Sequence, residues 1–253
     1  MQDLISAWKN FDHTKRPYLL DGDEIPENFI VRHKGWKEYI SNPNLGDGND
    51  TKLHLDLLPI PFVGNLKTAS VFLLMLNPGL GHHDYFGEYK ISEYRKALLE
   101  NLQQSKSSSF FFLDPQFSWH GGYQYWHSKL HNLIKQFSEK PEIGISYGQA
   151  LNFFRKEIAI VELIPYHSVS FHLPEKVIRE LKSAQLVQKF MTEQAETKNC
   201  LVVVTRSVEQ WKLPKGKNVV CFTPQQARSA HLSVESERIL NFLGERFVAT
   251  GKS

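Results

Sequence analysis

The residues best suited to chemistry stand at the ends of four apolar runs, where polar side chains follow abruptly. The first run ends in NPGLGHHDY at residues 77–85, which places the amide of Asn77 near two histidines, His82 and His83. These histidines are suited to contacting a phosphate or lining a pocket. Asn, Pro and Gly also form good turns, so a strand followed by a plain turn is the alternative. The other three runs end in PYHSVSF (165–171), TRSVEQW (205–211) and TPQQARSAHLS (223–233).

The apolar runs themselves have the pattern of buried strands. They are continuous rather than alternating, which is typical of strands that are covered on both faces in a parallel sheet. The four runs are SVFLLML (70–76), IAIVELI (158–164), CLVVVT (200–205) and NVVCF (218–222). Ligands bind beyond the carboxyl ends of such strands, so the polar segments that follow them are predicted to form the site.

Helical patterns alternate with these runs. Apolar residues at spacings of three and four predict helices over residues 91–104, 125–137, 174–196 and 234–247. This alternation predicts an α/β fold, a three-layer α/β/α sandwich with a central four-stranded parallel sheet. No repeat or linker divides the chain, so residues 1–253 are predicted to form a single domain. Its first part, 1–54, is expected to be a mostly helical N-terminal wrap with a flexible loop at 42–51.

The composition excludes several classes of protein. With 41% hydrophobic and 12% aromatic residues, the 253-residue chain has enough apolar side chains for a sizeable core. The net charge of +3 permits nucleic-acid binding without requiring it. Cys200 and Cys221 lie in apolar runs and are predicted to be core thiols of a reduced compartment. There is no signal-peptide pattern and no apolar stretch near the ~20 residues of a membrane span, so a cytoplasmic protein without a membrane partner is expected.

Three motifs resemble those of the uracil-DNA glycosylase superfamily. NPG (77–79), preceded by LPIPFVGNLKTASVFLLML, resembles the first motif of the branch that has Asn rather than Asp at this place. That branch holds the mismatch-specific and the single-strand-selective glycosylases. ARSA (227–230) resembles the Ala-Arg-small-Ala of thymine-DNA glycosylases, and VELIPYHS (161–168) falls where the family has its base-reading strand end. The resemblance covers roughly residues 55–245 and implies the family's fold and its base-excising activity.

The resemblance implies roles for the first motif. Breaking an N-glycosidic bond passes through an oxocarbenium-like sugar, which needs a positioned water more than a deprotonated one. Asn77 would hold that water through its amide oxygen, and the alternative is that Asn77 only caps the turn. Strict uracil-specific relatives have an aromatic residue at the place of Gly79, so glycine leaves room for a base substituted at C5. The alternative is that Gly79 supplies a positive φ. Leu80 would line the same pocket.

Glu162 departs from the family, whose uracil-reading members usually have Asn near this place. A carboxylate suits the exocyclic amine of cytosine, and a protonated one in a dry pocket would donate to N3 of the leaving base. Glu162 is therefore predicted to be catalytic. The alternative is a side chain that points outward or pairs with an Arg or Lys.

The second motif carries the expected DNA contacts. Arg228 resembles the wedge that fills the space left by a flipped nucleotide. Its neighbours would contact DNA, and they are Thr223, Gln225, Gln226 and Ser229. Thr223 stands where stricter uracil enzymes have the histidine that stabilises the leaving base, so His167 or His231 is the candidate replacement.

An aromatic segment, SSSFFFLDPQFSWHGGYQYWH (107–127), supplies candidates for stacking on the flipped base. The candidates are Phe110, Phe111 and Phe112, and a hydrophobic plug beneath a long loop is the alternative. His127 and His131 lie four apart on a predicted helix, but no clear third ligand accompanies them, so no metal is expected.

Together these assignments predict a monofunctional DNA glycosylase that acts as a monomer without a cofactor. No lysine stands in the three motifs to form a Schiff base, so no strand cleavage is expected. Gly79 with Glu162 favours a cytosine enlarged at C5, such as hydroxymethylcytosine or its glucosylated forms, which defence-associated glycosylases remove from phage DNA. The alternatives are a repair glycosylase for uracil or mismatched thymine, a non-catalytic module that binds modified DNA, and a small-molecule nucleoside hydrolase.

Overall fold

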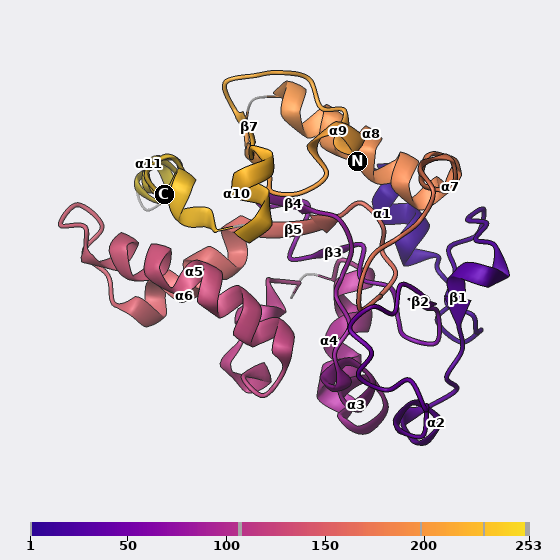
Figure 1. Ribbon diagram of the computed structural model, residues 1–253. Coiled ribbons are helices and arrows are strands. Elements are labelled where there is room, and N and C mark those ends of the chain that lie inside the picture. The colour runs from indigo at the N-terminus through magenta and orange to yellow at the C-terminus, as the bar shows by residue number, and fades with distance from the viewer. Residues whose placement is uncertain (1, 106–107, 198, 230, 251–253) are drawn as a thin grey trace. The chain divides into compact units, whose positions relative to one another are not determined.

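The computed structural model describes residues 2–105, 108–197, 199–229 and 231–250. About half of the residues are helical and the main sheet is mostly parallel, which confirms the predicted α/β class (Figure 1). The chain divides into two compact units. The first comprises residues 1–62, 75–107 and 161–193, and the second comprises residues 63–74, 108–160 and 194–253. Because each unit is assembled from separated segments, no linker marks a boundary in the sequence.

Four of the five strands in the main sheet are the predicted apolar runs. The strand order is β3-β5-β4-β6-β7, and the strands are β3 (Phe62–Val63), β4 (Val71–Met75), β5 (Ile158–Glu162), β6 (Leu201–Val204) and β7 (Val219–Cys221). β6 pairs in parallel with both β4 and β7. Every residue of β4, β5 and β6 is buried, which explains their continuous apolar pattern. The prediction of four strands is wrong by one, because β3 is too short to show a recognisable pattern.

The remaining elements of the second unit are helical. They are η2 (Phe111–Leu113), η3 (Pro115–Phe117), α5 (Gly121–Glu139), α6 (Tyr147–Glu157), α9 (Val208–Trp211), α10 (Pro224–Ser229), η4 (Leu232–Glu235) and α11 (Ser236–Thr250). The predicted helix at 125–137 begins earlier, because the His120 side chain accepts the N–H of Gly122 and caps α5. The capping box of Ser146 and Gln149 starts α6, which the apolar spacing did not indicate.

The first unit combines short elements with long loops. Its elements are α1 (Gln2–Lys9), η1 (Glu27–Phe29), β1 (Ile30–Val31), α2 (Trp36–Ile40), β2 (Leu53–His54), α3 (His82–Lys90), α4 (Ser92–Leu102), α7 (Glu175–Glu180) and most of α8 (Lys182–Thr197). The described part of 1–54 therefore holds short helices, loops and the parallel pair β1–β2 instead of the expected mostly helical wrap. The helix predicted over 174–196 is interrupted, because the backbone at the buried Leu181 is extended.

The two cysteines differ in their surroundings. Cys200 is buried just before β6, and burial raises the pKa of its thiol to about 11. Cys221 is exposed at the end of β7, so the prediction that both are core thiols is wrong for Cys221. The physical reason is that β7 is the last strand in the sheet order and only one of its residues is buried.

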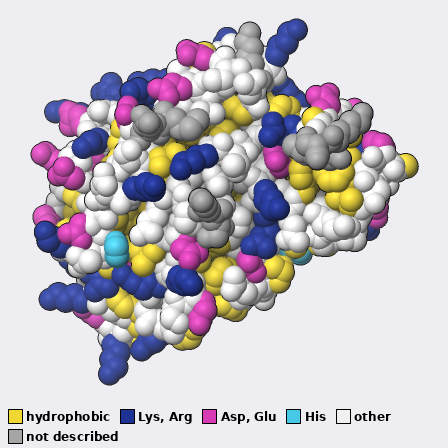
Figure 2. All heavy atoms as spheres, turned by 180° about the vertical axis from the view of Figure 1, so that it is seen from behind, with side chains coloured by type: hydrophobic (Ala, Val, Ile, Leu, Met, Phe, Trp, Pro, Cys, Tyr) yellow, Lys and Arg dark blue, Asp and Glu magenta, His cyan; other side chains and the backbone are white. Residues whose placement is uncertain are grey.

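In the view of Figure 2, Lys and Arg side chains are interspersed with Asp and Glu. Any contact with nucleic acid on this face would therefore depend on a few local groups. Among the described residues, no helix is both long and apolar enough to cross a membrane.

Candidate active site

Two of the predicted polar segments meet in the first unit. The chain leaves β4 through residues 76–81 and leaves β5 through residues 163–168. The backbone N–H of Ile164 donates to the carbonyl of Leu76 at 2.9 Å, and the N–H of Ser168 donates to that of Pro78 at 3.4 Å. These bonds hold the NPG motif against the PYHS segment. The structure thus brings together side chains that are far apart in the sequence.

Asn77 is the half-buried residue at the centre of this arrangement. Its Nδ2 lies 2.9 Å from Ser168 Oγ, 3.2 Å from the carbonyl oxygen of Tyr166 and 3.0 Å from that of Pro78. The two carbonyl oxygens can only accept hydrogen bonds, so the amide nitrogen must face them. Oδ1 then points away, and no donor from the described residues contacts it. Asn77 therefore presents a fixed, unoccupied hydrogen-bond acceptor.

His167 lies beside this amide with a defined tautomer. Its Nδ1 is 2.8 Å from the carbonyl oxygen of Gly79, which only accepts, so Nδ1 carries the hydrogen. The other ring nitrogen, Nε2, then has a lone pair when the ring is neutral and a proton when the ring is charged. The residue is only 3% exposed. The contact with Gly79 thus fixes the orientation of the His167 ring.

Gly79 is exposed and borders open space. A Cβ placed on this residue would have no heavy atom within 4 Å. Gly79 is also absent from the residues with positive φ, so the alternative that the turn requires glycine here is wrong. An alanine would fit at this position, whereas a larger side chain would extend into the open space beside Gly79.

Glu162 is the last residue of β5 and is 7% exposed. Its backbone N–H donates to the carbonyl of Pro61 at 2.9 Å. Because the residue is buried, the alternative that its side chain points out to solvent is wrong. This burial is compatible with the predicted base-reading role and equally with the alternative of a carboxylate that is paired with an Arg or Lys.

The chain matches no known protein family model, and comparisons with curated proteins and with solved structures gave no significant match. The likeness of the three motifs to the glycosylase superfamily therefore stays a prediction.

His82 and His83 begin α3, and Leu80 lies two residues before it. Leu80 is half-buried and packs on the cluster formed by Tyr39, Leu57 and Tyr85. His82 is exposed, and its Nδ1 lies 2.9 Å from the hydroxyl of Tyr39. His83 Nε2 lies 3.3 Å from a carboxylate oxygen of Asp84. Both histidines thus have partners within the unit, and the exposed ring edge of His82 remains available to a ligand.

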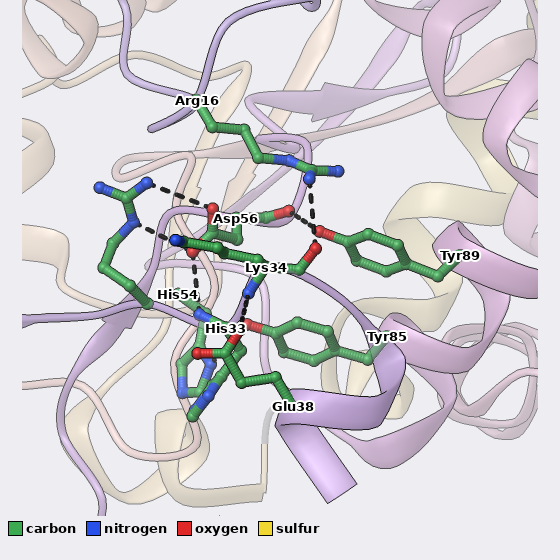
Figure 3. A network of polar contacts seen from close by, with 9 residues as sticks. Arg16, His33, Lys34, Glu38, His54, Asp56, Tyr85 and Tyr89 are labelled. Atoms are coloured by element: carbon green, nitrogen blue, oxygen red, sulfur yellow. Dashed lines mark hydrogen bonds and ion pairs between the residues drawn. The ribbon is translucent and has the colours of Figure 1, made fainter.

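A polar network around Asp56 supports the site, and the motifs did not reveal it (Figure 3). The fully buried carboxylate accepts from Arg32 Nε at 3.0 Å and from the backbone N–H of His33 at 2.9 Å. The Tyr89 hydroxyl donates to the Asp56 carbonyl, and the Arg16 guanidinium lies 4.9 Å from the centre of the Tyr89 ring. The one signal in the sequence was the pair of polar residues inside the apolar run LHLDLL (53–58).

His54 links this network to the candidate site. Its backbone N–H donates to the carbonyl of His167, and its Nδ1 lies 3.1 Å from the hydroxyl of Tyr85. Burial, with the neighbouring His33 and His167 and against the opposing charge of Asp50, lowers the pKa of His54 to about 4. The ring is therefore neutral near pH 7.

Acidification is expected to destabilise the protein through His54. At pH values between the ordinary histidine pKa of about 6.5 and the lower pKa in the folded protein, the unfolded chain binds a proton at His54 that the folded chain does not. The free energy of unfolding therefore decreases as the pH is lowered. The contribution between pH 7 and pH 5 is about 2 kcal/mol. Urea unfolding at both pH values should show a smaller fall for His54→Gln than for the wild type.

Glu88, whose pKa burial raises to about 7, has the opposite effect on the pH dependence of stability. Its contribution cancels in the comparison, because it is present in both the wild type and His54→Gln. His172→Gln replaces an exposed histidine and should keep the wild-type pH dependence. A His54→Gln protein with an unchanged dependence would show that His54 is not buried in the neutral form.

The second motif belongs to the second unit. Thr223 caps α10, since its Oγ1 accepts the N–H of Gln226 and its own N–H donates to Gln226 Oε1 at 2.8 Å. This capping box gives both residues a structural role that the pattern T-x-x-Q indicates. Gln225 and Arg228 are exposed on α10, and His231 is exposed after it. Ser229 ends α10, and its side chain lies outside the described residues.

The aromatic segment is packed into the second unit. Phe110, Phe111 and Phe112 are all buried, and Phe112 stacks on His120 with ring centres 5.3 Å apart. A Cβ on Gly122 would meet the Phe112 ring at 2.5 Å, so the packing here is close. This supports the hydrophobic plug instead of the expected stacking face at Phe111 and Phe112. The buried rings already stabilise the protein itself.

Proposed function

We propose that the chain is a monofunctional DNA glycosylase that hydrolyses the N-glycosidic bond of a flipped pyrimidine. The orientation of the Asn77 amide is the observation that carries this proposal. Two carbonyl acceptors hold the nitrogen, so the oxygen is directed outward at the carboxyl end of a buried strand. An amide oxygen held in this way accepts one hydrogen of a water and aims the water's lone pair at the anomeric carbon.

The chemistry needs two further groups. As the base departs, negative charge develops on it, and a proton donor or a hydrogen-bond donor stabilises that charge. His167 is proposed for this role in its charged form, in which Nδ1 donates to the Gly79 carbonyl and Nε2 also carries a hydrogen that it can donate to the departing base, in place of the histidine that Thr223 replaces. As the bond from the water oxygen to the anomeric carbon forms, the bond from that carbon to the base breaks, and the net result is that one hydrogen of the water ends on the departing base. The products are a free base and an abasic site.

The proposed substrate is a cytosine substituted at C5. The open volume beside Gly79 supports it, because a side chain at this position would exclude such a substituent. The buried carboxyl group of Glu162 also supports it, since it can pair with the exocyclic amine or donate to N3. Hydroxymethylated and glucosylated cytosines of phage DNA meet both requirements, and we propose a role in defence against phage.

The other parts of the proposal follow from this activity. The fold is proposed to be the three-layer sandwich of the uracil-DNA glycosylase superfamily. Arg228, exposed on α10, is proposed to fill the space left in the duplex by the flipped nucleotide. The protein is proposed to act as a monomer, without metal or cofactor, and in the cytoplasm.

Release of free base tests the proposal. Three DNAs of one sequence, containing uracil, hydroxymethylcytosine or glucosylated hydroxymethylcytosine, are incubated with excess protein, and released bases are identified by mass spectrometry. We expect a cytosine derivative to be released and the strand to break only after alkali treatment. Release of uracil alone would support the repair alternative and remove the argument from Gly79 and Glu162. Binding of modified DNA without release of any base would overturn the catalytic proposal.

A further inference from the structure

Phe86 is an exposed aromatic residue of α3 that none of the assigned roles uses. It is 40% exposed, and its ring packs edge to face on that of the half-buried Trp36 of α2, with ring centres 5.4 Å apart. Ile40, one helical turn after Trp36, is 43% exposed. α2 and α3 pack against each other, so these apolar side chains gather where the two helices meet (Figure 1). We call the rings of Trp36 and Phe86 the aromatic platform.

The aromatic platform adjoins the candidate active site. α3 begins at His82, directly after the NPGLG segment. His82 is exposed one turn before Phe86, and its Nδ1 lies 2.9 Å from the hydroxyl of Tyr39 on α2. Leu80 and Trp36 pack on the same buried cluster. The NPG motif and the platform are therefore neighbours within the first unit.

The exposed side of α3 carries positive charge and no carboxylate. Lys90 is exposed one turn after Phe86, so His82, Phe86 and Lys90 share one face of the helix. Both acidic residues of α3, Asp84 and Glu88, are buried. An anion beside the platform would therefore meet no negative charge on the exposed side of this helix.

Cations also gather before and on α2. The Arg16 guanidinium donates to the carbonyl of Lys34 at 3.3 Å (Figure 3), and Lys37 is exposed beside Trp36. Glu38 accepts the backbone N–H of Lys34 at 2.9 Å. The cations Arg16, Lys34 and Lys37 thus outnumber this carboxylate. Aromatic rings interleaved with cations are typical of surfaces that bind single-stranded nucleic acid.

We propose that the aromatic platform stacks on an unpaired nucleobase of single-stranded DNA next to the flipped nucleotide, while Lys37 and Lys90 contact its phosphates. Every base has a π-face, so such stacking accepts any neighbouring base, and it favours a single strand because the bases of a duplex are already paired and stacked. A protein partner is less well matched, because a stable protein interface buries about 800 Å² on each side and needs more apolar side chains than gather here. The inference rests on the proposed function only in taking DNA as the ligand, and it adds a preference for single strands.

Affinity for a strand that contains no pyrimidine tests the proposal. A fluorescent strand of about ten deoxyadenosines is titrated with the protein, and binding is followed by anisotropy. A second strand has the same phosphates joined by propanediol spacers, so it holds neither bases nor sugars. Phe86→Ala should weaken binding of the adenine strand about tenfold, as expected for one lost stack, and change binding of the spacer strand less than about twofold. Lys90→Gln should weaken both and reduce the slope of log affinity against log salt by about 0.7.

Two further variants of Phe86 separate stacking from folding. Phe86→Leu keeps an apolar side chain against Trp36 but removes the ring, so it should lose as much affinity as Phe86→Ala. Phe86→Trp should retain the wild-type affinity, because it keeps an aromatic surface. Full affinity in Phe86→Leu would overturn the proposal.

The matched control is Trp119→Ala, which removes another exposed aromatic side chain, 37% exposed, from the second unit. It should change the affinity for the adenine strand less than about twofold. Equal losses in this control and in Phe86→Ala would overturn the proposal, as would equal effects of Phe86→Ala on the two strands. So would a wild-type protein that binds neither strand. Because neither strand holds a pyrimidine, a protein that releases no base can still pass this test, and the two failures are distinguishable.

Discussion

Replacing Asn77 with alanine will lower the rate of base release by about a hundredfold to a thousandfold while the protein stays folded. The side chain supplies the only proposed acceptor for the attacking water, and loss of one well-positioned polar group at a reacting centre has effects of about this size. Its hydrogen bonds to Tyr166, Pro78 and Ser168 contribute about 1–2 kcal/mol to stability, so unfolding should not account for the loss. Single-turnover release of base measures the rate.

Three further variants separate orientation from other effects. Asn77→Asp would place a carboxylate oxygen against the carbonyl oxygens of Pro78 and Tyr166, so we expect a loss of activity near neutral pH although aspartate is the stronger base. Ser168→Ala leaves both carbonyls in place and should cost only a few-fold. Asn132→Ala, at an exposed position of α5, should retain full activity. An aspartate variant as active as the wild type would contradict the orientation argument.

Replacing Gly79 with tyrosine will change which base is released. The new ring would fill the space that no atom now occupies, and we expect release of a glucosylated cytosine to fall by about a hundredfold. Release of a base without a C5 substituent should fall much less. The same three DNAs, compared as ratios of single-turnover rates, measure this change in specificity.

Two glycine variants control for folding. Gly79→Ala should be stable, and at a position without positive φ it can stabilise the protein by about 0.4–1 kcal/mol. Gly48→Tyr adds the same ring at another open, exposed glycine and should leave the preference between bases unchanged. If Gly79→Tyr released the enlarged base at the wild-type rate, the volume beside Gly79 would not belong to the base pocket.

The N-terminal part of the chain takes part in holding Asn77. The Tyr166 carbonyl accepts from Asn77 Nδ2, and the buried Tyr166 hydroxyl donates to Asp23 and accepts from the N–H of Leu20. Asp23 in turn accepts the N–H of Ser183 at the start of α8. Segments from both ends of the first unit therefore converge on one residue of the site.

Local pattern was enough to predict four of the five strands in the main sheet. The runs that became β4, β5, β6 and β7 are apolar because parallel strands are covered on both faces, which leaves a signal within each short segment. Polar residues such as Asn77 and His167 follow these runs because the chain is no longer covered on both faces once the strand has ended. The capping box of Thr223 and Gln226 was also present as a local pattern, although the resemblance had suggested DNA contacts for both residues.

Long-range contacts decided the rest. The acceptors that orient Asn77 come from Tyr166 and Ser168, which stand 89 and 91 positions further along the chain. The direction of Glu162 was equally undetermined, because a strand residue faces either side depending on what covers the sheet. The sequence by itself determined the α/β class, four strands of the main sheet and the candidate residues. Only the tertiary structure decided which of them meet and which, like Phe112, are buried, because those outcomes depend on packing between distant segments.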